Sequence, residues 1–263
     1  MKLLTVPAWR GMQWLRGGFR VFLRQPLAYT ALFMAFLFGL MVLLSLPSIG
    51  ALVGLILVPA ANVGFVLASE TAEAGRTPSP ALLVVALRGP RARVIAMIQI
   101  GIAYALAALL AKWLADLIDP GFDERLAAFM EPASDPANLA LPVDDLQWGL
   151  LLRLLLPVPL TLVFWHAPVI VYRSGIGAAK AVFASAVACW RNLGAFAVYG
   201  LSWVILLTVF AVFTLGFFAM LGQPRFAVLV TVPAALMFST AFYASLYFSV
   251  VDCFDFDPDT EPA

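Results

Sequence analysis

The side chains with the widest chemical repertoire gather in residues 164–196. This stretch holds His166, the only histidine of the chain, inside an apolar segment. An ionisable group at that depth can relay a proton or contact a substrate. It can also be a neutral imidazole that hydrogen-bonds a carbonyl freed by a nearby proline, and we favour this second interpretation.

Arg191 and Asn192 follow, where a short amphipathic helix is expected to meet a long apolar one. Arginine offers a planar fork of donors that fits a lipid phosphate. It is equally an ordinary anchor at the membrane surface, and both interpretations stay open. Because Pro168 frees a carbonyl at a similar depth, we expect a vestibule that takes an anionic lipid headgroup. The candidate lipid or ligand contacts are Trp165, His166, Tyr172, Arg191 and Asn192.

The rest of the chain offers no recognisable catalytic or cofactor chemistry. A single histidine argues against the multi-histidine metal sites of membrane enzymes. Cys189 and Cys253 have neither a metal-site nor a disulfide-framework spacing. The sequence shows neither a nucleophile beside a base nor a phosphate-binding loop. We therefore predict no catalytic residue, cofactor, metal or nucleic-acid partner, and an enzyme is the least favoured class.

The composition indicates which elements must position these side chains. Hydrophobic residues make up 63% of the chain and charged residues 12%, with a mean hydropathy of +0.97. Soluble domains have about 25% charged residues. We predict an all-α polytopic membrane protein with one domain over residues 1–251, since about 20 apolar helical residues cross the hydrocarbon layer. The six predicted transmembrane helices are 27–46, 49–68, 94–115, 148–172, 194–221 and 226–250.

An amphipathic helix is predicted over residues 8–24, before the first span. One face carries Met12, Leu15, Phe19 and Phe22, and the other carries Arg10, Gln13, Gly17, Arg20 and Arg24. A basic face opposite a bulky apolar one is typical of a helix that lies in the headgroup region and attracts anionic lipid. Gln25-Pro26 should end this interfacial helix.

The basic residues predict the orientation of the spans. Twelve of the sixteen lysines and arginines fall on one side of the six-span arrangement. By the positive-inside rule that side is the cytoplasm, and it holds both termini.

Two acidic segments are expected outside the bilayer. Residues 116–147 carry eight acidic residues and one basic residue. Their spacing does not match an EF-hand, so we interpret the segment as a solvated periplasmic loop with one short surface helix near Phe122. Lys112 and Asp116, one turn apart, should pair beside it, and Arg153 should extend to the same surface. The tail 252–263 is expected to be disordered.

A shift of 100 residues aligns several positions of the chain. The aligned pairs include Pro59 with Pro159, Gly75 with Gly175, and Arg91 with Arg191. Together with the helix 8–24, this register indicates three units, each a short helix followed by two spans and related by an axis along the membrane normal. Chance coincidence in a chain rich in Ala, Leu and Val is the alternative.

Four motifs carry a family resemblance. They are WLRGGFRVF at residues 14–22 before Gln25-Pro26, Phe164-Trp165 with Ala167-Pro168, ACWRNLGAFAVY at 188–199, and AFYASLYFSVVD at 241–252. The chain resembles the uncharacterised six-helix inner-membrane proteins of proteobacteria. These are distantly similar to the membrane domain that accompanies some bacterial glycerophosphodiester phosphodiesterases. The resemblance implies a bacterial inner-membrane location and brings no catalytic residues, because the phosphodiesterase motifs are absent here.

Two functions remain in view. The first is a non-enzymatic scaffold, regulator or complex subunit that interacts with membrane lipid, through a protein partner that the sequence does not identify. The second is a carrier for a small amphiphile or lipid. A polar cavity through the bundle would favour the carrier, and a filled core would favour the scaffold. We expect the scaffold, because few polar groups lie within the spans to bind a solute.

Overall fold

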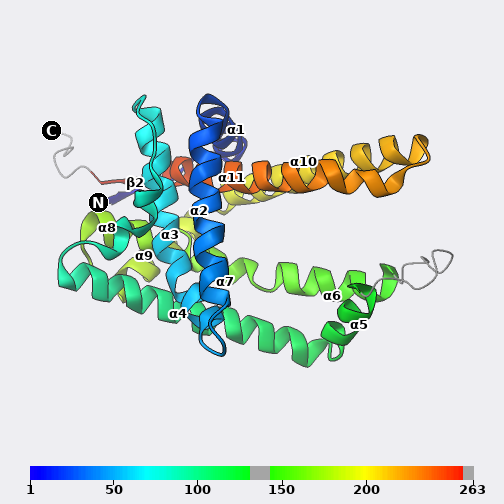
Figure 1. Cartoon of the computed structure of the whole chain (residues 1–263). Helices are drawn as coiled ribbons and strands as arrows, with labels where there is room; N and C mark the ends of the chain where they lie inside the picture. Colours follow the sequence, from blue (N-terminus) through cyan, green and yellow to red (C-terminus); the bar gives the residue numbers. More distant parts are fainter. Residues whose placement is uncertain (131–142, 257–263) are drawn as a thin grey trace.

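A computed structural model describes residues 1–130 and 143–256. Over these residues the chain is all-α apart from two short strands (Figure 1). The helices are α1 (Arg10–Arg24), α2 (Pro26–Leu44), α3 (Gly50–Glu73), η1 (Pro80–Leu87), α4 (Arg91–Ile118), α5 (Phe122–Met130), α6 (Val143–Leu155), α7 (Val158–Phe164), α8 (Ala167–Ser174), α9 (Ala178–Arg191), α10 (Leu193–Met220), η3 (Pro224–Phe226) and α11 (Ala227–Cys253). The strands are β1 (Lys2–Leu3) and β2 (Phe254–Asp255).

Six helical segments are long and apolar enough to cross a membrane, which confirms the predicted all-α polytopic class. They are Pro26–Leu44, Gly50–Glu73, Arg91–Ile118, Leu146–Ser174, Leu193–Met220 and Ala227–Cys253. The fourth is broken into α6, α7 and α8 at prolines: Pro157 and Pro159 lie at the first break, and Pro168 starts α8. Each proline lacks an amide hydrogen and clashes with the preceding turn, so a helix bends or restarts there.

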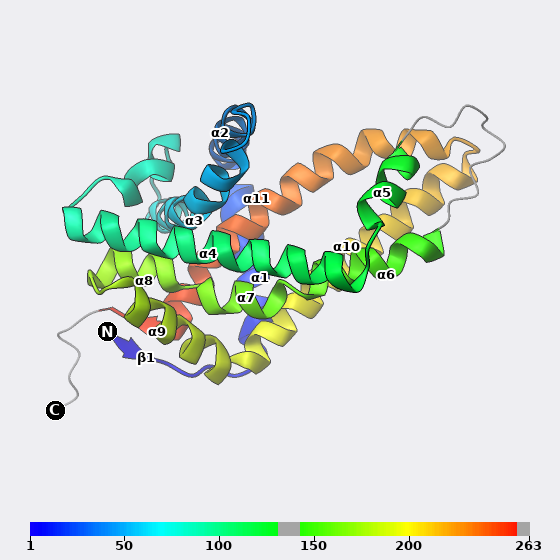
Figure 2. The ribbon, with the colours of Figure 1, turned by 90° about the horizontal axis from the view of Figure 1, so that it is seen from below.

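The six segments do not share one direction. α4, the α6–α8 segment, α10 and α11 run lengthwise, whereas α2 and α3 run across them (Figures 1 and 2). Glycines mark the closest helix contacts. A Cβ added at Gly101 of α4 would lie 2.1 Å from the Ile56 carbonyl oxygen of α3. One added at Gly64 would lie 2.6 Å from the Leu82 carbonyl oxygen of η1.

α1 packs inside the fold along one face. Trp14 is 1% exposed, and a Cβ added at Gly11 or Gly18 would strike the backbone of α10 or α11, at 2.1 Å from Ala195 O and 2.4 Å from Ala241 O. Gly17, predicted on the basic face opposite the apolar one, is buried against the ring of Phe248. The predicted division of faces is therefore wrong at this position, because a glycine without a side chain permits close approach rather than exposure.

The basic residues of α1 pair with acids of the same chain. Arg20 and Arg24 each lie 3.3 Å from a Glu73 carboxylate oxygen, and Arg10 pairs with Asp252. These arginines therefore have protein partners as well as any lipid. A position of α1 in the headgroup region stays a prediction.

The ends of the described chain lie together. β1 and β2 pair antiparallel, with Lys2 opposite Asp255 and Leu3 opposite Phe254. The predicted disordered tail is therefore wrong for residues 252–256. α11 continues to Cys253, and ladder hydrogen bonds fix the strand that follows. Residues 257–263 lie outside the described residues.

The described parts of the acidic segment, residues 116–130 and 143–147, are also more helical than predicted. α4 runs to Ile118, and α5 is the short helix expected near Phe122. Lys112 Nζ lies 2.9 Å from the Asp116 carboxylate, which confirms that pair. Arg153 of α6 reaches the same carboxylate at 2.6 Å, and its guanidinium lies 3.9 Å from the centre of the Phe122 ring. Ion pairs thus join α4, α5 and α6 there, and residues 131–142 lie outside the described part.

Candidate functional site

His166 sits at the break between α7 and α8 and is completely buried. Its backbone N–H has left the helical ladder and donates instead to Ser185 Oγ of α9 at 3.0 Å. Its Nε2 lies 3.3 Å from Ser249 Oγ of α11, and its Nδ1 lies 3.7 Å from Cys189 Sγ. The imidazole therefore joins α8, α9 and α11 through hydroxyl and thiol groups. The sequence predicted that the imidazole bonds a carbonyl freed by a nearby proline. That prediction is wrong, because its partners are the Ser249 hydroxyl and the Cys189 thiol.

The bonds around Ser249 assign the imidazole protons. Ser249 Oγ donates its only proton to the Leu246 carbonyl at 2.8 Å and accepts from Trp165 Nε1 at 3.0 Å. The contact with His166 must then be donated by Nε2–H, which leaves Nδ1 to accept from the thiol of Cys189. Burial raises the pKa of that thiol above its ordinary value, so the pair holds a thiol rather than a nucleophilic thiolate.

Of the other predicted contact residues, Trp165 meets His166 at Ser249, whereas Tyr172, Arg191 and Asn192 do not converge with them on one vestibule. The Asn192 side chain clamps the N-terminal segment: Oδ1 accepts from Val6 N–H at 2.8 Å, and Nδ2 donates to the Leu4 carbonyl at 3.0 Å. Tyr172 lies under the guanidinium of Arg93, 5.2 Å from the ring centre. Arg191 is exposed at the end of α9. Of the five predicted residues, Trp165 alone also lines a large cavity.

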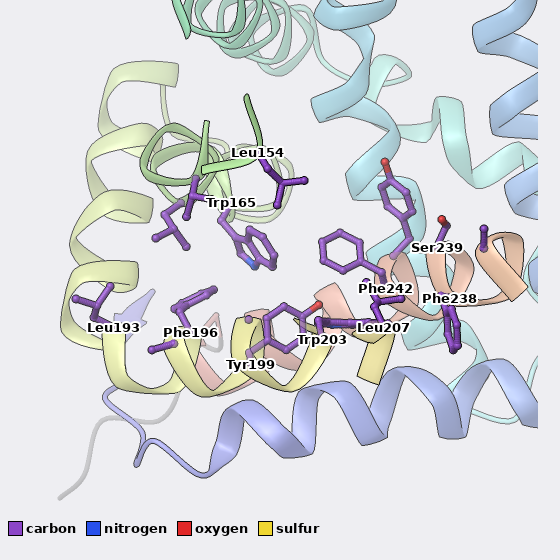
Figure 3. A pocket seen from close by; sticks show the side chains of 16 residues that line it. Leu154, Trp165, Leu193, Phe196, Tyr199, Trp203, Leu207, Phe238, Ser239 and Phe242 are labelled. Carbon is purple, nitrogen blue, oxygen red and sulfur yellow. The ribbon is translucent and has the colours of Figure 1, made fainter. Parts of the chain in front are cut away.

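That cavity, here called the aromatic cleft, lies between the α6–α7 segment and the α10–α11 pair and has a volume of about 810 Å³ (Figure 3). Seven aromatic side chains line it: Trp165, Phe196, Tyr199, Trp203, Phe238, Phe242 and Tyr243. In Figure 3, Trp165 points from the break between α7 and α8 toward Phe196 and Tyr199 of α10. The ring centres of Trp165 and Phe196 are 5.5 Å apart, in an edge-to-face arrangement typical of stable aromatic pairs.

The sequence held a signal for this wall that its overall hydrophobicity conceals. Phe196, Tyr199 and Trp203 follow one another at steps of three and four residues, and Phe238 and Phe242 on α11 are four residues apart. Such a stripe faces one side of a helix. In a chain in which nearly every helix face is apolar, the stripe cannot be told from packing until the tertiary arrangement is known.

A smaller polar recess lies against the aromatic cleft. It has a volume of about 150 Å³ and shares Trp165, Phe242 and Tyr243 with the cleft wall. On its other side it is lined by Asn62 of α3, Tyr104 of α4 and Thr161 of α7, among others. The Asn62 Oδ1 atom is buried and accepts no hydrogen bond from any described residue.

Comparison with known proteins identifies the family of the chain. A probable inner membrane protein of Burkholderia thailandensis is 31% identical over 256 residues, which cover 97% of this chain and 94% of that protein. The chain belongs to the same inner-membrane protein family. No family model matches it, and no solved structure matches it significantly.

The electrostatic character of the cleft and the recess is set by the side chains that line them. None of the described residues that line the cleft or the recess has a charged side chain. Buried Trp203 Nε1, on the cleft wall, makes no well-aligned hydrogen bond with any described residue. The site can therefore hold an apolar chain and satisfy a few hydrogen-bonding groups. A bare ionic group would lose its hydration there without gaining a counter-charge.

Proposed function

We propose that this protein binds a membrane amphiphile, with the apolar chain of the amphiphile in the aromatic cleft. The observation that carries this proposal is a volume of about 810 Å³ walled by aromatic side chains from three spans. Ligand sites have volumes of about 300–1,000 Å³ and are mostly apolar, with a few placed polar groups. A chain is the fitting occupant, because the cleft is built by spans whose surroundings are lipid rather than water.

This favours a lipid or amphiphile carrier over a pure scaffold. A polar cavity through the bundle is not what the described residues form, yet the space between α7 and α11 is not filled either. The scaffold finds support in the outer faces of α2 and α10, where Phe38 is 70% and Phe213 72% exposed. Lipid covers such faces as readily as a partner protein would, so this exposure alone requires no partner.

Several further features belong to the same proposal. We place the protein in the bacterial inner membrane without an enzymatic role, and the pairing of β1 with β2 supports placing its ends on one side. The excess of basic residues supports the cytoplasm as that side. Arg191, exposed at the end of α9 and absent from the cleft lining, is proposed as a separate contact for the headgroup of a surrounding anionic lipid. A distant kinship to the phosphodiesterase-associated membrane domain is proposed on the quoted motifs alone.

Two glycines of α10 provide a matched test. Gly200 lines the aromatic cleft and Gly216 does not, and a Cβ added at either would meet nothing within 4 Å. Gly200→Phe should fill the cleft, whereas Gly216→Phe should point away from it at a similar change in helix propensity. Each variant, purified in mild detergent, would be assayed for co-purified lipid by mass spectrometry and for crosslinking to a photoactivatable long-chain lipid.

We expect Gly200→Phe to retain about tenfold less lipid than the parent protein, a loss of about 1.4 kcal/mol of binding free energy. Gly216→Phe should retain as much as the parent. Equal retention by the two variants would show that the cleft does not hold the lipid, and the proposal would fail.

A further inference from the structure

We infer that the polar recess selects the head of the bound molecule, and that this head is an uncharged group bearing a hydroxyl. The ligand is then a long-chain alcohol or another neutral membrane lipid with a free hydroxyl. This inference rests on the proposed function, because the chain of the same molecule occupies the aromatic cleft.

The cleft and the recess adjoin each other at three shared side chains. Trp165, Phe242 and Tyr243 line both, so a chain packed against these rings brings its end to the recess. The recess, at about 150 Å³, has less than a fifth of the cleft volume of about 810 Å³. A small head therefore fits the recess and a bulky one does not.

The absence of charge in the lining decides against a phosphate or an ammonium head. Among the described residues, no lysine, arginine, histidine, aspartate or glutamate lines the recess or the cleft. An ion moved there from water would lose its hydration without meeting a counter-charge, and that cost exceeds what a few neutral hydrogen bonds return. A neutral head carries no such cost.

The unmatched acceptor on Asn62 decides for a donor on the ligand. Its Oδ1 is buried and receives no hydrogen bond from the described residues. The Thr161 hydroxyl, also at the recess, already donates to the Pro157 carbonyl at 2.9 Å. A buried acceptor left without a donor is costly, so a hydroxyl proton supplied by the ligand stabilises the complex. Tyr104 and Tyr243 bring further hydroxyls, and these can donate to the oxygen of the same ligand group.

Three single-chain probes separate these requirements. Oleyl alcohol has the donor, its methyl ether lacks only the donor, and oleyl phosphate is charged. Binding of each to the purified full-length protein would be measured by competition against a photoactivatable long-chain alcohol. We expect oleyl alcohol to bind about tenfold more tightly than the ether and more tightly still than the phosphate. Equal binding of alcohol and ether, or preferential binding of the phosphate, would overturn the inference.

Single substitutions in the recess test whether its side chains give the preference for the alcohol over the ether. Asn62→Leu should bind alcohol and ether alike, because it removes the acceptor and leaves the aromatic cleft. Tyr104→Phe should reduce the preference in part. Gly216→Phe lines neither the cleft nor the recess, so it is the matched control and should keep the preference. A preference that persists in both Asn62→Leu and Tyr104→Phe would refute the recess as the selector.

Gly200→Phe distinguishes the proposed chain binding in the cleft from the inferred head selection in the recess. If Gly200→Phe weakens the binding of all three probes while the parent does not distinguish alcohol from ether, chain binding stands and head selection fails. If Gly200→Phe binds all three probes as the parent does, the proposed function itself fails.

Discussion

Asp252 joins α1 to α11, and replacing it by alanine tests how strongly α1 belongs to the folded core. The carboxylate accepts from Trp14 Nε1 at 2.6 Å and pairs with the Arg10 guanidinium. Trp14 is 1% exposed, so removing its acceptor leaves a buried N–H unpaired, at a cost of about 1–3 kcal/mol. The Arg10 side chain is 35% exposed, and solvent screening limits its part to at most about 1 kcal/mol. We expect Asp252→Ala to lower the free energy of unfolding by about 2–3 kcal/mol.

The measurement is detergent-driven unfolding of the purified protein, followed by tryptophan fluorescence and circular dichroism. Arg16→Ala, at an exposed position of the same helix, should change stability by less than about 0.5 kcal/mol. Arg10→Ala should fall between the two, because the bond from Trp14 to Asp252 remains. The hydrogen bond to Asp252 raises the pKa of Arg10, so its stabilisation is present at lower pH and lost only above the ordinary arginine range. An Asp252→Ala protein as stable as Arg16→Ala would refute α1 as a core element.

Two further predictions address orientation and lipid contact. Cys189 and Cys253 are 2% and 0% exposed, so neither native thiol should react with an impermeant reagent from either side. Cysteines introduced at exposed Ala179 and Gln223 should report instead: in intact spheroplasts we expect Gln223→Cys alone to react, and the reverse pattern would invert the proposed topology. Arg191→Ala should lose anionic phospholipid adducts in native mass spectrometry, and Arg173→Ala should lose fewer, because its guanidinium already lies 2.6 Å from Glu70. Unchanged adducts in Arg191→Ala would make that arginine a topological anchor only.

The sequence was sufficient to predict the helices because hydropathy reports burial in lipid, residue by residue. The predicted spans 27–46 and 194–221 differ from α2 and α10 by at most two residues at each end. α4 extends three residues beyond the prediction at both ends, since Arg91 and Asp116 leave the hydrocarbon without ending the helix. Hydropathy marks the bilayer, whereas capping and proline mark the helix, and the two limits need not coincide.

Contacts between distant residues could not be predicted in the same way. Arg10 and Asp252 are 242 residues apart in the chain, and nothing in either local pattern identifies the other as its partner. The Asn192 amide looks like part of a polar surface, but it is occupied by the backbone of residues 4 and 6. The aromatic cleft depends on how far α10 stands from α7, a distance set by the whole packing and not by either helix alone.

The proposed repeat offers a physical reason for where the cleft opens. Gly75 and Gly175 both have a positive φ at the end of a helix, and α4 and α10, which follow a short helix in each unit, are both 28 residues long. α4 presents Gly101 and other small buried residues to its neighbours, which lets α3 approach to backbone contact. α10 instead turns Phe196 and Trp203 inward, and such rings hold α7 at a distance. If the units share an origin, exchanging small residues for aromatic ones at this interface is enough to turn a packed seam into a ligand-sized cleft.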